Sequence, residues 1–161
     1  MYLIRGKNNL ELFKKFHPDI NLHATIGNFD GLHRGHQSIL SKIKERAIET
    51  KASSIVFFTE PHASEYFAIS NNSDAKAPPR ICPWRKKFEL LEEYGIDFAF
   101  FLKFNSSLRK MTPETFISDI LEPVGLLSLT VGDDFRFGAN RAGDFQLLRE
   151  WGSKNNINVT N

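Results

Sequence analysis

The stretch HATIGNFDGLHRGH, from His23 to His36, contains the pattern that decides the fold. Its first residues, His23 to Gly27, are mostly apolar or β-branched and predict a short strand. From about His36 to Thr50 the apolar residues recur at helical spacing on one face, which predicts a helix. A strand therefore enters a helix through a turn that contains glycines.

The same alternation continues along the rest of the chain. Further strands are predicted at residues 54–58, 96–102, 126–131 and 157–160. Further helices are predicted from Pro83 to Gly95, from Thr112 to about Pro123 and from Asp144 to Trp151. Strands that alternate with helices form parallel sheets with right-handed crossovers. We therefore predict an α/β fold, a doubly wound parallel sheet of about five strands with helices on both faces.

Length and composition limit the classes of protein to which this chain can belong. Its 161 residues fit one domain, residues 1–161, and 41% hydrophobic residues indicate that this domain is globular. A formal charge of +2 gives no overall field that would attract nucleic acid. The single cysteine, Cys82, excludes an internal disulfide and a cysteine-based zinc site. The longest apolar run, Phe98 to Leu102, is far too short to span a membrane, so we expect a soluble, cytoplasmic protein.

Two other features are predicted to be structural. Basic residues cluster at 42–46 and 85–87, but glutamates lie near both clusters, so solvated helix faces are favoured over an RNA-binding surface. Residues 70–79, SNNSDAKAPP, contain no apolar anchor and predict a mobile loop rather than a linker between domains. The sequence gives no prediction of the oligomeric state.

The turn after the strand at 23–27 is the first candidate site, because ligands in such sheets bind at the carboxyl ends of the strands. A helix N-terminus offers free N–H groups and a partial positive charge, which attract phosphate. Gly35 lets an anion approach the backbone, and His33 and His36 lie on the same side of the first helical turn. Both histidines can donate a hydrogen bond to one phosphate. The alternatives are structural histidines or a metal-binding pair, for which no third ligand is apparent.

The loop after the strand at 126–131 carries further candidates. The rings of Phe135 and Phe137 are two residues apart, and a flat heteroaromatic ring can stack on them. Arg136 can pair with a phosphate, and Asp134 can accept from a ring N–H or a ribose hydroxyl. The alternative is an aromatic plug beneath a glycine-rich loop.

The turn motif resembles that of a known family. His33-Arg34-Gly35-His36 is similar to the H-x-G-H signature of the nucleotidyltransferases with a Rossmann-like fold. The longer string from Gly27 to His36 resembles that of bacterial FAD synthetase, the adenylyltransferase module of the bifunctional riboflavin kinase/FAD synthetase. The resemblance extends from about Ala24 to Val159.

Two further loops resemble the same family. One is Thr59-Glu60-Pro61-His62 with Phe67 downstream, which by itself is equally consistent with a plain turn after a strand. The other is Val131 to Gly138, followed by Arg141 to Asp144. In the first loop, Ala63 stands where family members often have a second proline.

The resemblance implies that the chain transfers AMP from ATP to FMN, which gives FAD and pyrophosphate. It implies that His33 and His36 are catalytic, and that Mg²⁺ accompanies ATP without a dedicated metal site on the protein. It assigns ATP binding to Gly27, Asn28, Phe29, Asp30, Gly31, His33, Gly35 and His36. It assigns flavin binding to Pro61, His62, Phe67, Asp134, Phe135, Arg136 and Phe137.

One part of the family pattern is not found. The family has a later signature of the form I-S-S-T-R that binds the ATP phosphates, and this sequence shows neither it nor a riboflavin kinase domain. We therefore expect the chain to be a fragment of a protein that continues past Asn161. Two alternatives stay open. One is a sister nucleotidyltransferase that uses another acceptor, such as a phosphopantetheine or a cytidylyl-transfer substrate. The other is a flavin- or nucleotide-binding module without turnover.

Overall fold

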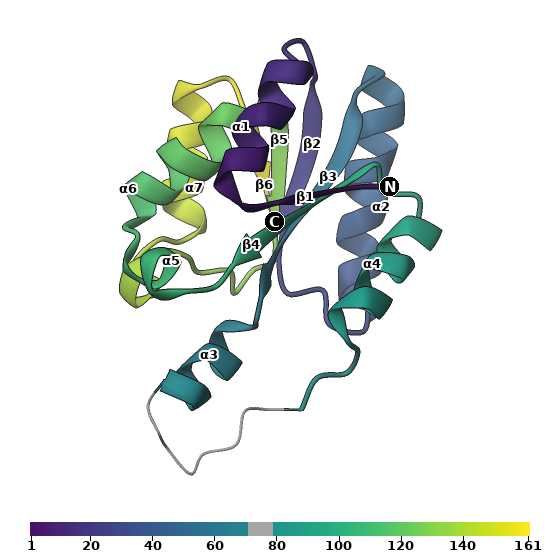
Figure 1. The fold of residues 1–161 in the computed structure, drawn as a ribbon. Helices are drawn as coiled ribbons and strands as arrows, with labels where there is room; N and C mark the ends of the chain where they lie inside the picture. The colour runs from purple at the N-terminus through teal and green to yellow at the C-terminus, as the bar shows by residue number, and fades with distance from the viewer. Residues whose placement is uncertain (71–78) are drawn as a thin grey trace.

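The computed structural model describes residues 1–70 and 79–161, so most of the loop predicted over 70–79 lies outside the described residues. Within them, parallel strands form one six-stranded sheet with the order β1-β4-β3-β2-β5-β6 (Figure 1). The strands are β1 (Tyr2–Arg5), β2 (Leu22–Ile26), β3 (Ser53–Glu60), β4 (Phe98–Lys103), β5 (Leu126–Val131) and β6 (Asn158–Thr160). The α-helices are α1 (Gly6–Phe16), α2 (Arg34–Thr50), α3 (Ala63–Ser70), α4 (Trp84–Glu93), α5 (Ser106–Lys110), α6 (Pro113–Phe116) and α7 (Phe145–Lys154). A π-helical turn, Ile117–Leu121, extends α6, and short 3₁₀ turns occupy Glu122–Val124 and Ala139–Arg141.

The predicted α/β architecture is confirmed, but the sheet has six strands rather than about five. The additional strand is β1, which lies at one edge and pairs with β4. Its signal in the sequence is weak because it is four residues long and only Ile4 is buried in it.

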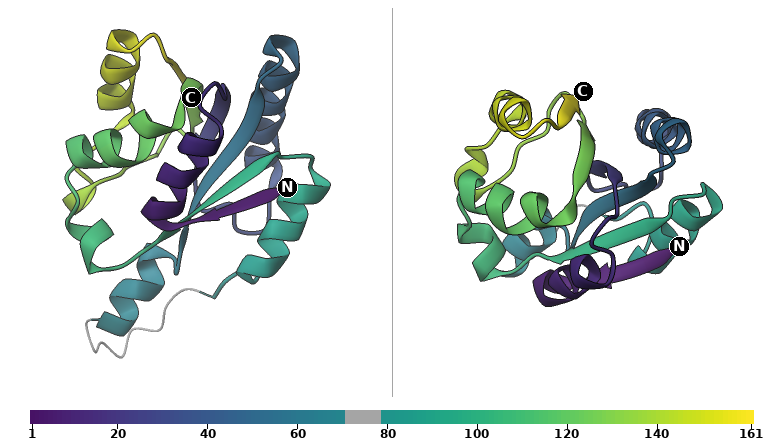
Figure 2. Two further views of the ribbon diagram at one scale, coloured as in Figure 1. Left: turned by 45° about the horizontal axis from the view of Figure 1, so that its top comes forward. Right: turned by 90° about the horizontal axis from the view of Figure 1, so that it is seen from above.

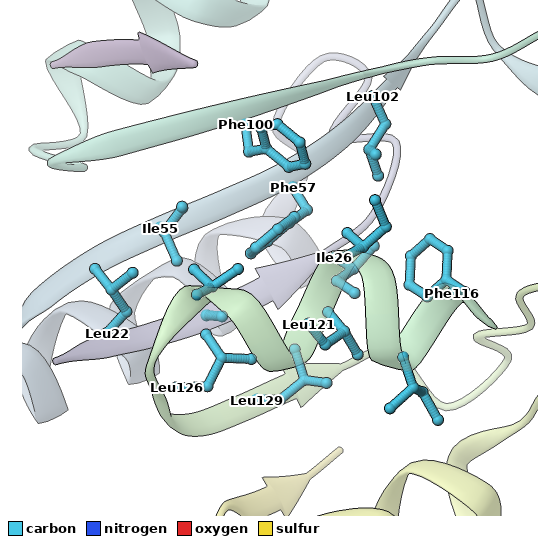
Figure 3. Close-up of a cluster of buried hydrophobic side chains, with 14 of the residues drawn as sticks. Leu22, Ile26, Ile55, Phe57, Phe100, Leu102, Phe116, Leu121, Leu126 and Leu129 are labelled. Atoms are coloured by element: carbon cyan, nitrogen blue, oxygen red, sulfur yellow. The ribbon is translucent and has the colours of Figure 1, made fainter. Parts of the chain in front are cut away.

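The core lies on both faces of the sheet, because neighbouring residues of a strand point to opposite sides. In β3, Ile55 and Phe57 belong to one buried cluster, whereas Val56 and Phe58 belong to the other. The first cluster includes residues of α1, α6 and α7, and the second includes residues of α2 and α4. Helices therefore cover both faces, as further views of the sheet show (Figure 2). Figure 3 shows the first cluster, in which Phe57 and Phe100 meet edge to face at 5.3 Å between ring centroids.

Two loops end in a residue whose side chain caps the N-terminus of the next helix. Thr112 accepts a hydrogen bond from the backbone N–H of Thr115, and Pro113 occupies the first turn of α6, which confirms the helix start predicted there. Asp144 caps α7 in the same way through the N–H of Leu147. The helices α1, α3 and α5 were not predicted. No helix in the described part of the chain is long and apolar enough to cross a membrane.

Candidate active site

A cavity of about 1300 Å³ opens at the carboxyl ends of the central strands. Its walls come from the turn after β2, the ends of β3, β4 and β5, the helix α3 and the loop that follows β5. A site for one drug-sized ligand has a volume of roughly 300 to 1,000 Å³. The cavity is therefore larger than a site for one such ligand requires.

The turn between β2 and α2 supplies one wall of this cavity. Of the residues predicted to bind ATP, those that line the cavity are Gly27, Asn28, Phe29, His33, Gly35 and His36. His33 is the N-cap of α2, and its Nδ1 accepts a hydrogen bond of 3.4 Å from the backbone N–H of His36. The rings of His33 and His36 stack with 3.7 Å between centroids. A β-carbon on Gly35 would lie 3.2 Å from the His33 ring, so the glycine leaves room for that ring.

His36 is held as a neutral imidazole. Burial, followed by the charges of His33 and Lys87, lowers its pKa from 6.5 to about 4, although Asp30 opposes the shift. Its Nδ1 is buried and has no hydrogen-bond partner among the described residues. The ring also packs against Phe29, with 4.9 Å between centroids. Nε2 is therefore the ring atom that remains for a ligand, and in the neutral ring it can serve as a donor.

The loop after β5 and the helix α3 supply aromatic side chains to other walls of the cavity. Asp134, Phe135, Arg136 and Phe137 all line the cavity, and so does Phe67 of α3. The rings of Phe135 and Phe137 stack at 5.8 Å with 17° between their planes. The structure thus brings the loop after β5 and the segment around Phe67 to the same cavity as the histidine turn.

These aromatic side chains differ in burial. Phe137 is only 7% exposed, belongs to the hydrophobic core and packs against Phe116 at 5.3 Å between centroids. Phe67 is 36% exposed, and the guanidinium carbon of Arg109 lies 5.1 Å from the centre of its ring. Phe67 and the half-buried Phe135 therefore offer more ring surface to a ligand than Phe137 does.

Four predicted site residues, Asp30, Gly31, Pro61 and His62, do not line the cavity. The Asp30 carboxylate accepts hydrogen bonds from the backbone N–H groups of Ile81, at 2.8 Å, and Cys82, at 3.0 Å. Gly31 has a φ of +73°, and a β-carbon there would lie 2.6 Å from the Ile81 side chain. Asp30 and Gly31 thus hold the turn in contact with residues 81–82. Pro61 and His62 lie in the connection between β3 and α3.

Lys87 corrects the prediction of a solvated basic face at 85–87, because its side chain is fully buried. Its ammonium lies 5.2 Å from the centre of the Phe58 ring and 3.2 Å from Nε2 of His62. Burial is the main cause that lowers its pKa, and the carboxylates of Glu60 and Asp30 oppose that effect. Helical spacing places Lys87 on the same face as Leu91, but its charge favoured the interpretation as part of a solvated face.

Other residues at the cavity were missed by sequence reasoning. They are polar or basic side chains of α2, β3, α5 and the loops, namely Ser38, Lys42, Thr59, Arg109, Asn140 and Arg141. Lys42 was placed on a solvated helix face, and it is exposed but also lines the cavity. The available signal was the position of Thr59 and Arg109 after predicted strands, at the edge where ligands bind.

Acidification is expected to destabilise the fold between pH 6.5 and about 4. Burial is the main cause that lowers the pKa values of His23, His36 and His62. As the pH falls, the unfolded chain therefore binds protons at these residues at a higher pH than the folded chain does. His23 illustrates the cause, since it is only 4% exposed and its Nδ1 and Nε2 lie 2.7 and 2.8 Å from the hydroxyls of Ser128 and Thr50. The stability contributed by neutral histidines is complete above pH 6.5 and is lost as the pH falls. Urea unfolding should show a decrease on the order of 2 kcal/mol.

The control for this expectation is His36→Gln, which removes one of the three titrating groups and should flatten the pH dependence. NMR titration of the imidazole carbons assigns the protonation to single residues. A free energy of unfolding that stays constant between pH 7 and pH 4.5 would contradict the expectation.

The amino-acid sequence matches the FAD synthetase family over residues 16–161. It is 38% identical over 161 residues to the bifunctional riboflavin kinase/FMN adenylyltransferase of Escherichia coli (strain K12). That match covers 99% of this chain and 49% of the relative. The protein of the same name from Pseudomonas fluorescens is 39% identical over 160 residues, with 99% and 48% covered. The chain thus spans about half the length of these curated relatives.

The fold is also similar to a solved structure. The crystal structure of a macrolide-efflux protein from Streptococcus pneumoniae superimposes with a TM-score of 0.73 and 17% sequence identity. The match covers 99% of this chain and 49% of that one. At this level of identity the likeness concerns the fold alone.

Proposed function

The chain belongs to the FAD synthetase family, and we propose that it is an FMN adenylyltransferase, which transfers AMP from ATP to FMN and releases pyrophosphate. The observation that carries this proposal is that one cavity joins the histidine turn to the aromatic side chains of α3 and of the loop after β5. A triphosphate suits the turn, because a helix N-terminus and two imidazoles converge there. A flavin ring suits the opposite side, where Phe67 and Phe135 present apolar ring surface.

The proposed reaction needs no strong base from the protein. An oxygen of the FMN phosphate forms a bond to the α-phosphorus of ATP, and the bond from that phosphorus to the bridging oxygen breaks. The departing pyrophosphate takes the electron pair. Because the FMN phosphate is already an anion at neutral pH, catalysis depends on position and on donors to the charge that develops. His33 and His36 are the proposed donors, with the N-terminal N–H groups of α2.

We also propose that Mg²⁺ enters with ATP. Among residues 1–70 and 79–161, no three His, Cys, Asp or Glu side chains are grouped so that they could hold a metal ion. The exposed carboxylates of Asp133 and Asp134 line the cavity and can add ligands. These residues suit a Mg²⁺ ion that is held mostly by phosphate oxygens and water and that neutralises phosphate charge.

FMN binding is expected to depend on Phe67. Phe67→Ala removes exposed ring surface from the wall of the cavity, so FMN affinity should fall by about 1 kcal/mol or more if the flavin stacks there. Quenching of FMN fluorescence measures the affinity. Leu12→Ala removes an exposed apolar side chain on α1, away from the cavity, and is the matched control. Equal FMN affinity in the Phe67 variant and the parent would remove Phe67 from the binding site.

The test of the proposed activity is the formation of FAD from FMN and ATP with Mg²⁺, followed by chromatography and by release of pyrophosphate. 4′-Phosphopantetheine with ATP, and CTP in place of ATP, serve as alternative substrates. FAD and pyrophosphate in equal amounts support the proposal. Transfer to phosphopantetheine alone, or FMN binding without any turnover, contradicts it.

A further inference from the structure

The helix α3 stands away from the layers of the fold. It projects beyond the carboxyl end of the sheet, below the strands in Figure 1. Its residues Ala63, Ser64 and Phe67 nevertheless form part of the cavity wall. The rings of Tyr66 and Phe67 contact the ring of Phe104, at 5.3 and 6.0 Å between centroids. The position of α3 therefore decides where this wall lies.

Arg80 joins the first turn of α3 to the end of β3. Its Nη1 and Nη2 donate to the two carboxylate oxygens of Glu60, and the Nη1 bond is 2.9 Å long. Its Nε and Nη2 donate to the two oxygens of Glu65. One guanidinium thus binds two carboxylates, each through both of its oxygens, which is the geometry in which arginine pairs most strongly.

The side chain of Glu65 also accepts a backbone hydrogen bond at the N-terminus of α3. Its Oε2 accepts a hydrogen bond of 2.9 Å from the backbone N–H of His62, just before the helix begins. The side chains of Arg80, Glu60 and Glu65 are only 25%, 13% and 16% exposed. In such partly buried surroundings, removal of the cation leaves two carboxylates facing each other without compensation.

The segment that contains Arg80 also contacts the turn between β2 and α2. Residues 81 and 82, next to Arg80, donate their backbone N–H groups to the carboxylate of Asp30, in the turn that carries the two histidines. A continuous set of bonds therefore runs from α3 through Arg80 to the histidine turn. This set of bonds links the two walls between which the proposed reaction takes place.

We propose that Arg80 is a positioning residue for the acceptor substrate: it holds α3 against β3 and so fixes the distance between Phe67 and the histidine turn. The proposal rests on the proposed function for its kinetic consequence, but the placement of α3 can be tested without it. Arg80 does not line the cavity, so its effect passes through Glu60, Glu65 and the helix.

The test compares Arg80→Met and Arg80→Lys with Arg85→Met, which removes the same charge from an exposed arginine. Arg80→Met should raise the KM for FMN by about tenfold or more, because small misplacements at an active site carry large costs, and should leave the KM for ATP within about twofold. Arg80→Lys, which keeps the charge but not the paired geometry, should fall between Arg80→Met and the parent. Hydrogen exchange should become faster in the amides of α3, and Arg85→Met should behave like the parent.

Two results would overturn the proposal: unchanged amide exchange in α3, or equal changes in the KM values for FMN and ATP. If Arg80→Met fails to fold, Glu65→Gln is the second variant, since its amide oxygen can still accept from His62 while the ion pair is lost. Absence of FAD formation by the parent would instead contradict the proposed function, and the exchange measurement would still decide the role of Arg80.

Discussion

His36→Ala is expected to slow the transfer of AMP to FMN by about a hundredfold or more, since removal of one donor to a developing charge has this cost. The neutral His36 ring lines the cavity and has Nε2 left for a ligand. Loss of the ring should lower kcat and kcat/KM together, because the charge on the departing pyrophosphate is largest in the transition state. Steady-state turnover with saturating ATP and FMN measures the effect.

Further variants make this result specific. His36→Gln places an amide N–H near the position of Nε2 and should recover part of the activity. His33→Ala should affect the KM for ATP more than kcat, because His33 caps α2 and stacks on His36. His17→Ala, at an exposed histidine that follows α1, is the matched control and should leave the activity unchanged. Normal turnover in His36→Ala would exclude His36 from catalysis.

Phe137→Ala is expected to destabilise the fold by about 3 kcal/mol or more, as large-to-small substitutions of buried phenylalanine do. The ring packs on Phe116, and the backbone of Phe137 forms two hydrogen bonds with Gly143, at 3.0 and 2.9 Å. A β-carbon on Gly143 would lie 2.6 Å from the Phe137 ring, so no space separates them. Urea denaturation measures the loss.

The half-buried neighbour Phe135 provides the comparison. Compared with Phe137→Ala, Phe135→Ala should lower the free energy of unfolding less and weaken FMN binding more. Loss of FMN binding in Phe137→Ala without loss of stability would show that Phe137 acts on the ligand rather than in the core.

Periodicity predicted the architecture well because the central strands carry strong signals. Val56, Phe57 and Phe58 are fully buried between two helical layers, and such a strand is apolar on both faces. The strand–turn–helix around His33 and His36 was also predicted, because the apolar spacing there changes from that of a strand to that of a helix. The edge strand β1 was not predicted, since a strand of four residues is too short for its apolar pattern to identify it.

The parts of the site that sequence reasoning could not place depend on tertiary contacts. Phe135 and Phe137 are alike in the sequence, and only the packing of Phe116 and Gly143 makes the second one part of the core. No local rule separates these two phenylalanines, because their burial is decided by elements far away in the chain. Lys87 differs, since helical spacing places it on the face of Leu91 and separates it from the exposed Arg85 and Lys86.

The strand order also has a consequence for synthesis on the ribosome. β2 pairs with β3, which follows soon after it, so the histidine turn between them can form early. β1 pairs with β4, in the register Tyr2 opposite Phe98, and must wait until about a hundred more residues have been made. At translation rates of roughly 5 to 20 residues per second, the delay is about 5 to 20 s. β1 therefore waits much longer for its partner than β2 waits for β3, and chaperones have correspondingly longer access to it.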